Sequence, residues 1–225
     1  MEFIYKGKTK DIYKLKSGNY VLKFKDTVTG HPSGESDPGG NVVIGEVAGV
    51  AQNALKVTKY YFELLKLHKI KSHYIKADLD KNTLTVKPAQ TFGKGLEFVV
   101  RYVATGSFVR RFGDYIKDGA RFIAPIFEAT FKDDGRDDPP VTGEILEALG
   151  FMSQKDFKKM RDFTVKVCNI VKADLAQKNI DLWDIKLELG LCGGKITLID
   201  EISAGNMRAY KSGKKLSYDE LSNEF

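Results

Sequence analysis

Residues 181–202, DLWDIKLELGLCGGKITLIDEI, form the stretch on which the fold assignment rests. Two apolar-rich runs flank Leu191-Cys192-Gly193-Gly194, a pattern that predicts a β-hairpin. Side chains alternate between the two faces of a strand, so Asp184, Lys186 and Glu188 would share one face. The aliphatic residues between them would occupy the other. The polar row is therefore expected to face a cleft or solvent.

The return strand of this hairpin carries a second pair of acids. Ile196, Leu198 and Asp200 would share a face, and Glu201 would lie on the opposite one. Glu188 and Asp200 would then approach each other across the hairpin. Two carboxylates held close together repel unless a cation or a proton lies between them. Oxygen ligands of this kind suit Mg²⁺, which substrate phosphates complete. The alternative is a solvated strand face with cross-strand charge pairs.

Length and composition predict a soluble cytoplasmic protein. The 225 residues are enough for one large domain or two small ones, and 42% hydrophobic with 29% charged residues is ordinary for a globular chain. Apolar runs are too short to cross a membrane, and the N-terminal MEFIYKGKTKDIY lacks a signal-peptide core. Cys168 and Cys192 lack metal-site spacing and are expected to be free thiols in a reducing cytosol.

The charge distribution favours a small anionic substrate over a nucleic acid. The net charge is +6, and the basic residues are interleaved with acids along the chain. Nucleic-acid-binding proteins tend to concentrate basic residues on one face. Three histidines, at positions 31, 68 and 73, form no ligand cluster, which argues against a zinc site.

The remaining segments predict a mixture of strands and helices. We expect two strands and a turn in residues 1–25, a loop at 26–41, and a helix at 46–69. Further strands are expected at 74–77, 83–87, 97–103 and 122–131, with a connection between two subdomains near 89–94. A short helix is expected at 143–149. A long helix would follow it, capped by Ser153 with Asp156, and a short polar tail would follow Arg208.

Gly7 lies among Lys6, Lys8 and Lys10, and this turn is a candidate anion site. Glycine lets backbone amides approach an anion closely, and the lysines add positive charge. The spacing of a Walker loop is absent. An exposed basic turn is the alternative interpretation.

Arg101 lies in the apolar strand EFVVRYV and needs an anionic partner if it is buried. With Ser107, Arg110 and Arg111 it would form a site for a phosphate or carboxylate, whose geometry arginine matches well. A surface ion pair is the alternative. In the acidic loop at 132–141, Asp137 and Asp138 either approach a metal or are solvated.

In combination, these segments resemble the SAICAR synthetase (phosphoribosylaminoimidazole-succinocarboxamide synthase) family. Gly7-Lys8-Thr9-Lys10 resembles the family's G-K-[AT]-K loop, and Arg101 with Thr105-Gly106-Ser107 resembles its R-x-x-x-[TA]-G-S signature. Residues 184–190, DIKLELG, and 200–203, DEIS, resemble D-x-K-x-E-F-G and D-E-[IF]-S. Asp138-Pro139 resembles the family's D-P.

The resemblance implies an α+β fold with ATP in a cleft between two subdomains. A small N-terminal antiparallel-sheet subdomain would comprise residues 1–90, and a larger α+β subdomain residues 91–225. The implied activity belongs to purine biosynthesis. It joins the carboxylate of 5-amino-4-carboxyimidazole ribotide to the amino group of L-aspartate through an acyl phosphate, with ATP and Mg²⁺ as cofactors.

The family also implies a role for each matching residue. Gly7, Lys8, Thr9 and Lys10 would bind the nucleotide phosphates, and Lys87, Ala89 and Gln90 the adenine. Glu188 and Asp200 would hold Mg²⁺, and Lys186 would stabilise the transferring group. Arg101, Ser107, Arg208 and Asp138 would bind the ribotide side. Family precedent also allows a homo-oligomer.

Several positions depart from the family pattern on the side of the carboxylate and amine substrates. Gly205 stands where the family has an aspartate, and Ala209-Tyr210-Lys211 replaces L-W-D. The family also has an acid near the position of His31, and this chain lacks it. The sequence is therefore also compatible with a paralogous amide ligase acting on a different metabolite. It is compatible as well with a small-molecule kinase, a basic RNA-binding module or a nucleotide-binding pseudoenzyme.

Overall fold

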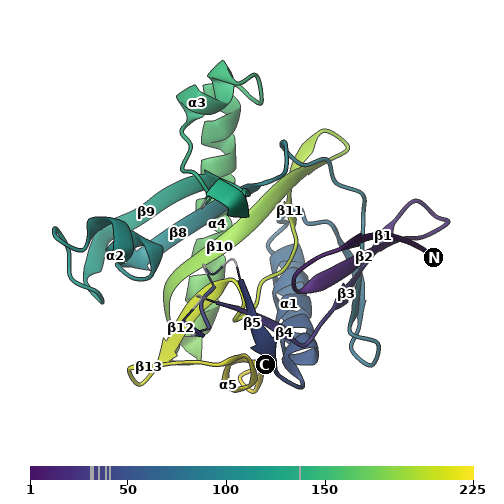
Figure 1. Cartoon of the computed structure of the whole chain (residues 1–225), viewed down its shortest axis with the longest axis horizontal. Helices are drawn as coiled ribbons and strands as arrows, with labels where there is room; N and C mark the ends of the chain where they lie inside the picture. Colours follow the sequence, from purple (N-terminus) through teal and green to yellow (C-terminus); the bar gives the residue numbers. More distant parts are fainter. Residues whose placement is uncertain (31–32, 35, 39, 41, 137) are drawn as a thin grey trace.

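The computed structural model describes residues 1–30, 33–34, 36–38, 40, 42–136 and 138–225. Within these residues the strands form two large antiparallel sheets and a two-stranded ribbon (Figure 1). The α+β class expected from the sequence is confirmed. The division into subdomains at residue 90 stays a prediction.

The first sheet has the strand order β1-β2-β3-β7-β6. Its strands are β1 (Glu2–Lys6), β2 (Lys10–Lys14), β3 (Tyr20–Phe24), β6 (Tyr74–Asp78) and β7 (Thr83–Val86). Residues 1–25 therefore hold three strands, and the prediction of two is wrong. The reason is a tight turn at residues 7–9, closed by a 2.9 Å bond from the Gly7 N–H to the Lys10 carbonyl oxygen, which separates β1 from β2.

The ribbon consists of β4 (Thr27–Gly30) and β5 (Val42–Glu46). The prediction of a loop at 26–41 is therefore wrong at residues 27–30, while residues 31, 32, 35, 39 and 41 lie outside the described residues. The β-branched run at 42–44 favours a strand, and this strand includes Glu46, where the helix was predicted to begin. Gly49, with φ of 89°, then turns the chain into α1 (Val50–Leu67).

The second sheet has the order β13-β12-β10-β8-β9, with β11 also paired to β10. Its long strands are β8 (Leu96–Val103), β9 (Arg121–Phe131) and β10 (Asp181–Cys192). The predicted hairpin is confirmed, because β10 pairs with β11 (Lys195–Ile199). Gly193 and Gly194 join them with φ of 56° and 72°, the backbone that a two-residue hairpin turn requires.

The C-terminal segment is more ordered than the predicted polar tail. It forms β12 (Met207–Lys211), β13 (Lys214–Lys215) and α5 (Tyr218–Ser222), and α5 packs against α1. The signal for α5 is a capping box in which Ser217 and Glu220 each bind the other's backbone N–H. Two more short elements were not predicted, α2 (Ser107–Phe112) and the 3-10 helix η1 (Asp134–Arg136).

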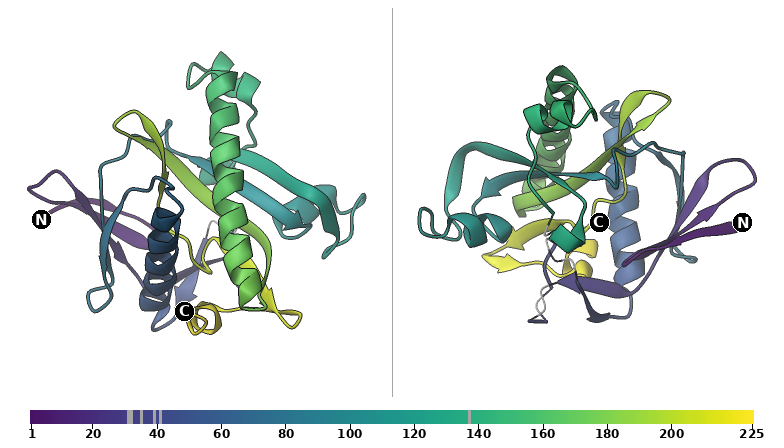
Figure 2. Two further views of the ribbon diagram at one scale, coloured as in Figure 1. Left: turned by 180° about the vertical axis from the view of Figure 1, so that it is seen from behind. Right: turned by 45° about the horizontal axis from the view of Figure 1, so that its top comes forward.

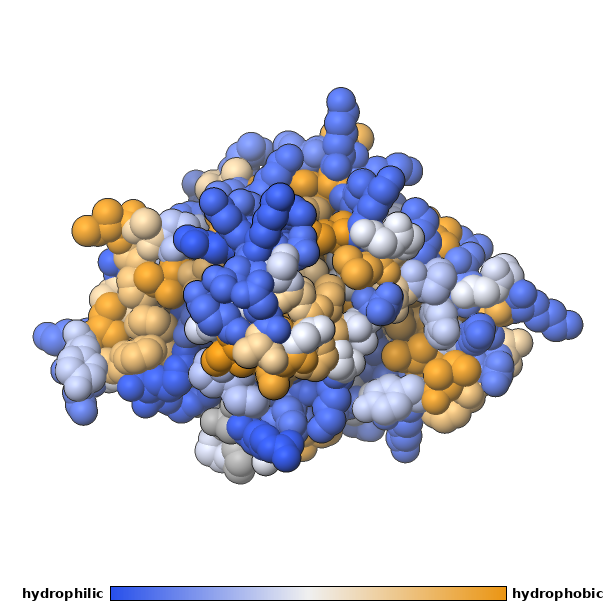
Figure 3. Space-filling view, turned by 90° about the horizontal axis from the view of Figure 1, so that it is seen from above, coloured by the Kyte–Doolittle hydropathy of each residue, from blue (hydrophilic) through white to orange (hydrophobic). Residues whose placement is uncertain are grey.

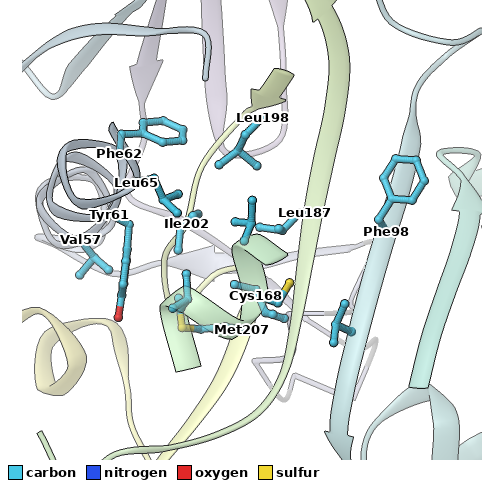
Figure 4. Close-up of a cluster of buried hydrophobic side chains, with 14 of the residues drawn as sticks. Val57, Tyr61, Phe62, Leu65, Phe98, Cys168, Leu187, Leu198, Ile202 and Met207 are labelled. Atoms are coloured by element: carbon cyan, nitrogen blue, oxygen red, sulfur yellow. The ribbon is translucent and has the colours of Figure 1, made fainter. Parts of the chain in front are cut away.

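Helix α4 (Gln154–Gln177) covers one face of the second sheet and follows the short helix α3 (Gly143–Ala148) (Figure 2). Ser153 caps α4 as predicted, because its hydroxyl accepts a 3.1 Å bond from the Asp156 N–H. The reciprocal half of a capping box is not formed, since the Asp156 carboxylate accepts from the Ser153 hydroxyl at 2.8 Å instead. One apolar cluster joins α1, α4 and both sheets. Figure 4 shows its centre, where α1 side chains face Leu198, Ile202 and Met207. This packing fixes the ends of β10 and β11 relative to the first sheet.

The surface mixes polar and apolar side chains, and on the face shown in Figure 3 the apolar ones form separate spots between polar ones. Among the described residues, no helix is long and apolar enough to cross a membrane. Cys168 is buried, Cys192 is half-buried, and the two are not bonded to each other.

Candidate active site

Strand β10 places the predicted polar row against two neighbouring cavities. In the antiparallel register with β8, Asp184 lies opposite Arg101 and Glu188 lies opposite Glu97. Lys186 lines both cavities, whereas Asp184 lines one and Glu188 the other. The alternation of the strand thus brings three charged side chains to one continuous cleft.

We name the first cavity the lysine cavity, and it lies between the Gly7 turn and the paired end of β10 and β11. Five lysines and five acids are among the residues that line it: Lys8, Lys10, Lys25, Lys132 and Lys186, with Glu97, Asp134, Glu188, Asp200 and Glu201. The opposite charges balance in number. The lysines are therefore expected to be held in ion pairs until a ligand enters.

Lys10 binds the two acids that follow β11. Its Nζ lies 2.9 Å from Asp200 Oδ1 and 2.5 Å from Glu201 Oε1. The prediction that these two acids face opposite ways is therefore wrong. Asp200 has φ of 63°, which breaks the alternation of the strand and lets both carboxylates reach one ammonium.

Two further lysines pair with acids in the same cavity. Lys132, just after β9, places its Nζ 2.5 Å from Glu188 Oε1. Lys186 Nζ lies 2.9 Å from Glu97 Oε1, on the strand next to its own. Each predicted reactive group of β10 thus has an oppositely charged partner.

The charges in this cavity shift one another's pKa values. Burial and the nearby Asp200 charge raise the pKa of Glu188, and Lys132 acts in the opposite direction. Burial would raise the pKa of Asp200 as well, but Lys10 and Lys132 outweigh it and hold that pKa at about 2. Burial tends to lower the pKa of Lys10, yet Asp200 and Glu201 raise it overall. Asp200 and Lys10 are therefore charged at neutral pH.

We name the second cavity the arginine cavity. It has a volume of about 580 Å³, within the range of small-molecule sites. Its basic wall consists of five arginines: Arg101, Arg110, Arg111, Arg136 and Arg208. Ser107 and Asp138 also line it, so the structure brings all four residues predicted for the ribotide side to one cavity. Asp137 lies outside the described residues.

Asp184 holds the two most buried of these arginines. Its Oδ2 accepts bonds from Arg101 Nη1 at 2.8 Å and from Arg208 Nη1 at 2.5 Å. Arg101 also binds Glu128 and donates to Ser107 Oγ at 2.7 Å, while Arg208 binds Asp37. Burial raises the pKa of Asp184, and the charges of the two guanidinium groups act against it. Arg101 therefore has the buried anionic partner that its strand position requires.

The Gly7 turn brings the predicted phosphate-binding residues to the lysine cavity. A Cβ at Gly7 would lie 2.4 Å from the Lys10 carbonyl oxygen, so the turn needs glycine there. Lys8, Thr9 and Lys10 line the cavity, and Lys8 Nζ lies 2.7 Å from Asp134 Oδ2 across it. The turn and the second sheet therefore form opposite walls.

Lys87, Ala89 and Gln90, predicted to bind adenine, are absent from the described lining of both cavities. Gln90 exchanges both backbone hydrogen bonds with Leu191, at 2.9 and 2.8 Å. The Lys87 N–H donates to the His73 carbonyl oxygen at 2.8 Å. These backbone groups are engaged in hydrogen bonds within the protein, and adenine binding by this segment stays a prediction.

Sequence reasoning gave no role in the site to Glu97, Lys132, Asp37 and Tyr218, and it overlooked Glu201 as a partner of Lys10. Glu97 had a detectable signal, since it alternates with Val99 and Arg101 along β8 as the acids of β10 do. The others reach the cleft from loops or from α5, where no local pattern points inward.

Glu188 and Asp200 have the chemistry of a site for Mg²⁺. Their charges act on each other in one cavity, and such ions favour carboxylate oxygens with phosphates as further ligands. In the described part of the chain no group of three or more His, Cys, Asp or Glu residues could hold a metal. Two carboxylates would leave most ligand positions of such an ion to phosphates and water, as is usual for Mg²⁺.

Comparisons with known proteins agree on one family. The family model described as SAICAR synthetase matches residues 3–223. A phosphoribosylaminoimidazole-succinocarboxamide synthase of Clostridium tetani is 50% identical over 216 residues, covering 95% of this chain and 94% of that protein. The Thermotoga maritima protein of the same name is 36% identical, covering 96% and 88%.

Solved structures show the same fold. A type-2 SAICAR synthetase in complex with ADP superposes with a TM-score of 0.84 at 31% identity, covering 96% of this chain and 88% of that one. A type-1 SAICAR synthetase from Pyrococcus horikoshii gives a TM-score of 0.81 at 30% identity, covering 93% and 88%. With its sequence matched almost from end to end and its fold shared, this chain belongs to the SAICAR synthetase family.

Proposed function

We propose that this protein joins the carboxylate of 5-amino-4-carboxyimidazole ribotide to the amino group of L-aspartate at the expense of ATP, in purine biosynthesis. The observation that carries the proposal is the position of Lys186, which lines the lysine cavity and the arginine cavity at once. A phosphoryl group passing from a nucleotide to a ribotide would cross at this residue.

The arginine cavity fits the ribotide. Arginine pairs well with phosphate and carboxylate oxygens, and this cavity presents five of them. Arg101 and Arg208 are held in place by Asp184, so their orientation is set before a ligand arrives. Ser107 and Asp138 add polar groups on the same wall. The 50% identity to the Clostridium tetani protein supports these substrates over those of a paralogue.

The lysine cavity has a volume of about 90 Å³, so it suits the phosphate groups of a nucleotide rather than the whole molecule. Lys8 and Lys10 would bind phosphates next to the Gly7 turn, and Glu188 with Asp200 would hold Mg²⁺. An ion held by these two carboxylates would supply positive charge to offset that of the phosphates. The type-2 relative was solved in complex with ADP, which supports nucleotide binding by this chain.

The chemistry needs two displacements. A ribotide carboxylate oxygen forms a bond to the γ-phosphorus of ATP as the bond to the β-phosphate oxygen breaks, which releases ADP. The aspartate amine then attacks the acyl carbon; the C–N bond forms, the C–O bond to phosphate breaks, and the amine loses a proton. Lys186 lies where it neutralises the oxygens of the transferring group. The protein contributes mainly positioning and charge.

The remaining expectations follow from this activity. The partners are a small anionic ribotide and an amino acid, with neither a nucleic acid nor a membrane required. A cytoplasmic location would place the enzyme with its substrates. A homo-oligomer is compatible with the proposal.

The test is an omission assay with ATP, Mg²⁺, the ribotide and L-aspartate, in which ADP release is followed and the product is identified by mass. The proposal expects the succinocarboxamide only when all components are present, and a strong decrease in its formation by Glu188→Gln at a Mg²⁺ concentration that just saturates the wild type. ADP formed without aspartate, together with a stable phosphorylated product, would establish a kinase instead. Mg²⁺-dependent ATP binding without turnover would refute the proposed substrates and favour a paralogue or a pseudoenzyme.

A further inference from the structure

Tyr218, on the short helix α5, reaches the wall of the lysine cavity beside Gly205. Both residues line this cavity. A Cβ built at Gly205 would lie 2.5 Å from the Tyr218 hydroxyl oxygen, closer than real contacts allow. The space that a side chain at position 205 would occupy is therefore filled by the hydroxyl of a residue thirteen positions later in the sequence.

The ring and the hydroxyl of Tyr218 have different surroundings. The half-buried ring packs against the main apolar cluster. Among the described residues, the hydroxyl has no hydrogen-bond partner. The hydroxyl is not enclosed by protein but open to the cavity, and tyrosine hydroxyls at such sites commonly bind a polar partner. An unused donor on a cavity wall points to a ligand that accepts from it.

The charges around the hydroxyl indicate what kind of ligand this is. Lys10 and Glu201 both act on it electrostatically, and Lys10 is the predicted phosphate-binding lysine of the Gly7 turn. Burial, followed by the Glu201 charge, raises the pKa of Tyr218, so the hydroxyl keeps its proton and acts as a donor. A neutral donor next to an ammonium group suits an anionic oxygen.

We propose that Tyr218 is a ligand-binding residue of the lysine cavity, whose hydroxyl donates a hydrogen bond to an anionic oxygen of a bound substrate. That oxygen belongs either to a phosphate of the nucleotide or to a carboxylate of the amino acid. Gly205 serves this role by leaving room for the hydroxyl. The inference rests on the proposed function only for the identity of these two ligands.

The first test compares Tyr218→Phe with the wild type and with Tyr13→Phe, whose ring packs against Phe3 outside the cleft. The KM values for ATP, L-aspartate and the ribotide are measured with Mg²⁺ present. Loss of a hydrogen bond to a charged group is expected to raise one KM about tenfold. A rise for ATP identifies the phosphate, and a rise for L-aspartate identifies the carboxylate. The ribotide KM should stay within about twofold.

If the wild type shows no turnover, the proposed function fails, but the inference is still tested by direct titration. Binding of Mg²⁺–ATP and of L-aspartate is then compared in the wild type and in Tyr218→Phe by calorimetry. Unchanged affinity for both ligands overturns the role of Tyr218. So does an equal loss for every ligand, because a merely disturbed cleft would produce that result.

The second test concerns the placement of the hydroxyl and needs no substrate. The φ of Gly205 is not positive, so alanine can adopt its backbone conformation. The expected strain in Gly205→Ala therefore comes only from steric contact of the added Cβ. Gly205→Ala should lower the melting temperature of the wild type by about 3–6 °C through overpacking. In Tyr218→Phe the shift should be smaller, since the next contacts are 3.2 Å to Ser203 Oγ and 3.4 Å to Tyr218 Cζ. Equal shifts in both backgrounds would overturn the placement.

Discussion

Replacing Asp184 by asparagine should destabilise the protein strongly, because this carboxylate compensates two buried guanidinium groups. Asp184 is 2% exposed, and its Oδ2 lies 2.8 Å from Arg101 and 2.5 Å from Arg208. Breaking a buried ion pair from one side costs roughly 3–5 kcal/mol, since it leaves a charge uncompensated. Both arginines keep a second acid, Glu128 or Asp37, so we expect the lower end, about 3 kcal/mol.

The assay is urea unfolding of Asp184→Asn, followed by circular dichroism, with melting curves alongside. A loss of about 3 kcal/mol corresponds to a fall of roughly 6–12 °C in melting temperature for a chain of this size. Asp181→Asn, in the same strand, is the matched control. Asp181 pairs with Arg121, whose side chain is 64% exposed, and such a surface pair contributes less than about 1 kcal/mol. If both variants lose the same free energy, or if Asp184→Asn loses less than about 1 kcal/mol, the role given to Asp184 is refuted.

Three more outcomes are expected. Burial lowers the pKa of His73 from 6.5 to about 4 in the folded state, so the unfolded chain takes up a proton at a higher pH than the folded one. The free energy of unfolding should therefore fall by about 3 kcal/mol as the pH drops from 6.5 to 4. Urea unfolding measured at several pH values without metal should show a weaker pH dependence in His73→Asn. Gly190→Ala should lower the free energy of unfolding by about 1–3 kcal/mol, because its Cβ would lie 2.9 Å from the Gln90 carbonyl oxygen. Gly45→Ala, with open space around the new Cβ, should change it little. Equal losses for the two variants in chemical denaturation would contradict this prediction. Glu188→Gln should raise the Mg²⁺ concentration for half-maximal activity on the order of tenfold or more, and an unchanged Mg²⁺ titration would exclude Glu188 as a ligand.

The part of the site that the sequence predicted is the part encoded by local periodicity. Asp184, Lys186 and Glu188 lie on one strand, and a period of two decides their common face without knowledge of the rest of the fold. The two glycines of the hairpin likewise specify the turn through their own backbone freedom. The capped start of α4 at Ser153 depends on residues only three positions apart.

The part that the sequence did not predict depends on contacts between distant segments or on one unusual backbone angle. Lys10 and Glu201 are 191 positions apart, and no periodicity in either segment relates them. Alternation along β11 fails at Asp200 because its φ is positive. Aspartate adopts this conformation more readily than most residues, but the sequence does not show which aspartate does so. Tyr218 falls in the segment predicted as a polar tail, although the capping box that places it is present in the sequence.

If the lysine cavity holds the proposed nucleotide and Mg²⁺, its charge pairs predict that the two ligands assist each other's binding. Lys10 is bound to Asp200 and Glu201, and Lys132 is bound to Glu188. A phosphate that draws Lys10 away leaves Asp200 and Glu201 with less compensation in a buried site, which is costly unless another cation approaches them. A cation at Glu188 and Asp200 in turn displaces the lysines, which then need anionic partners such as phosphates. Each ligand therefore removes the electrostatic cost of binding the other, and such a coupling is reciprocal. A cavity with five lysines is thus expected to bind ATP weakly when Mg²⁺ is withheld, despite its many positive charges.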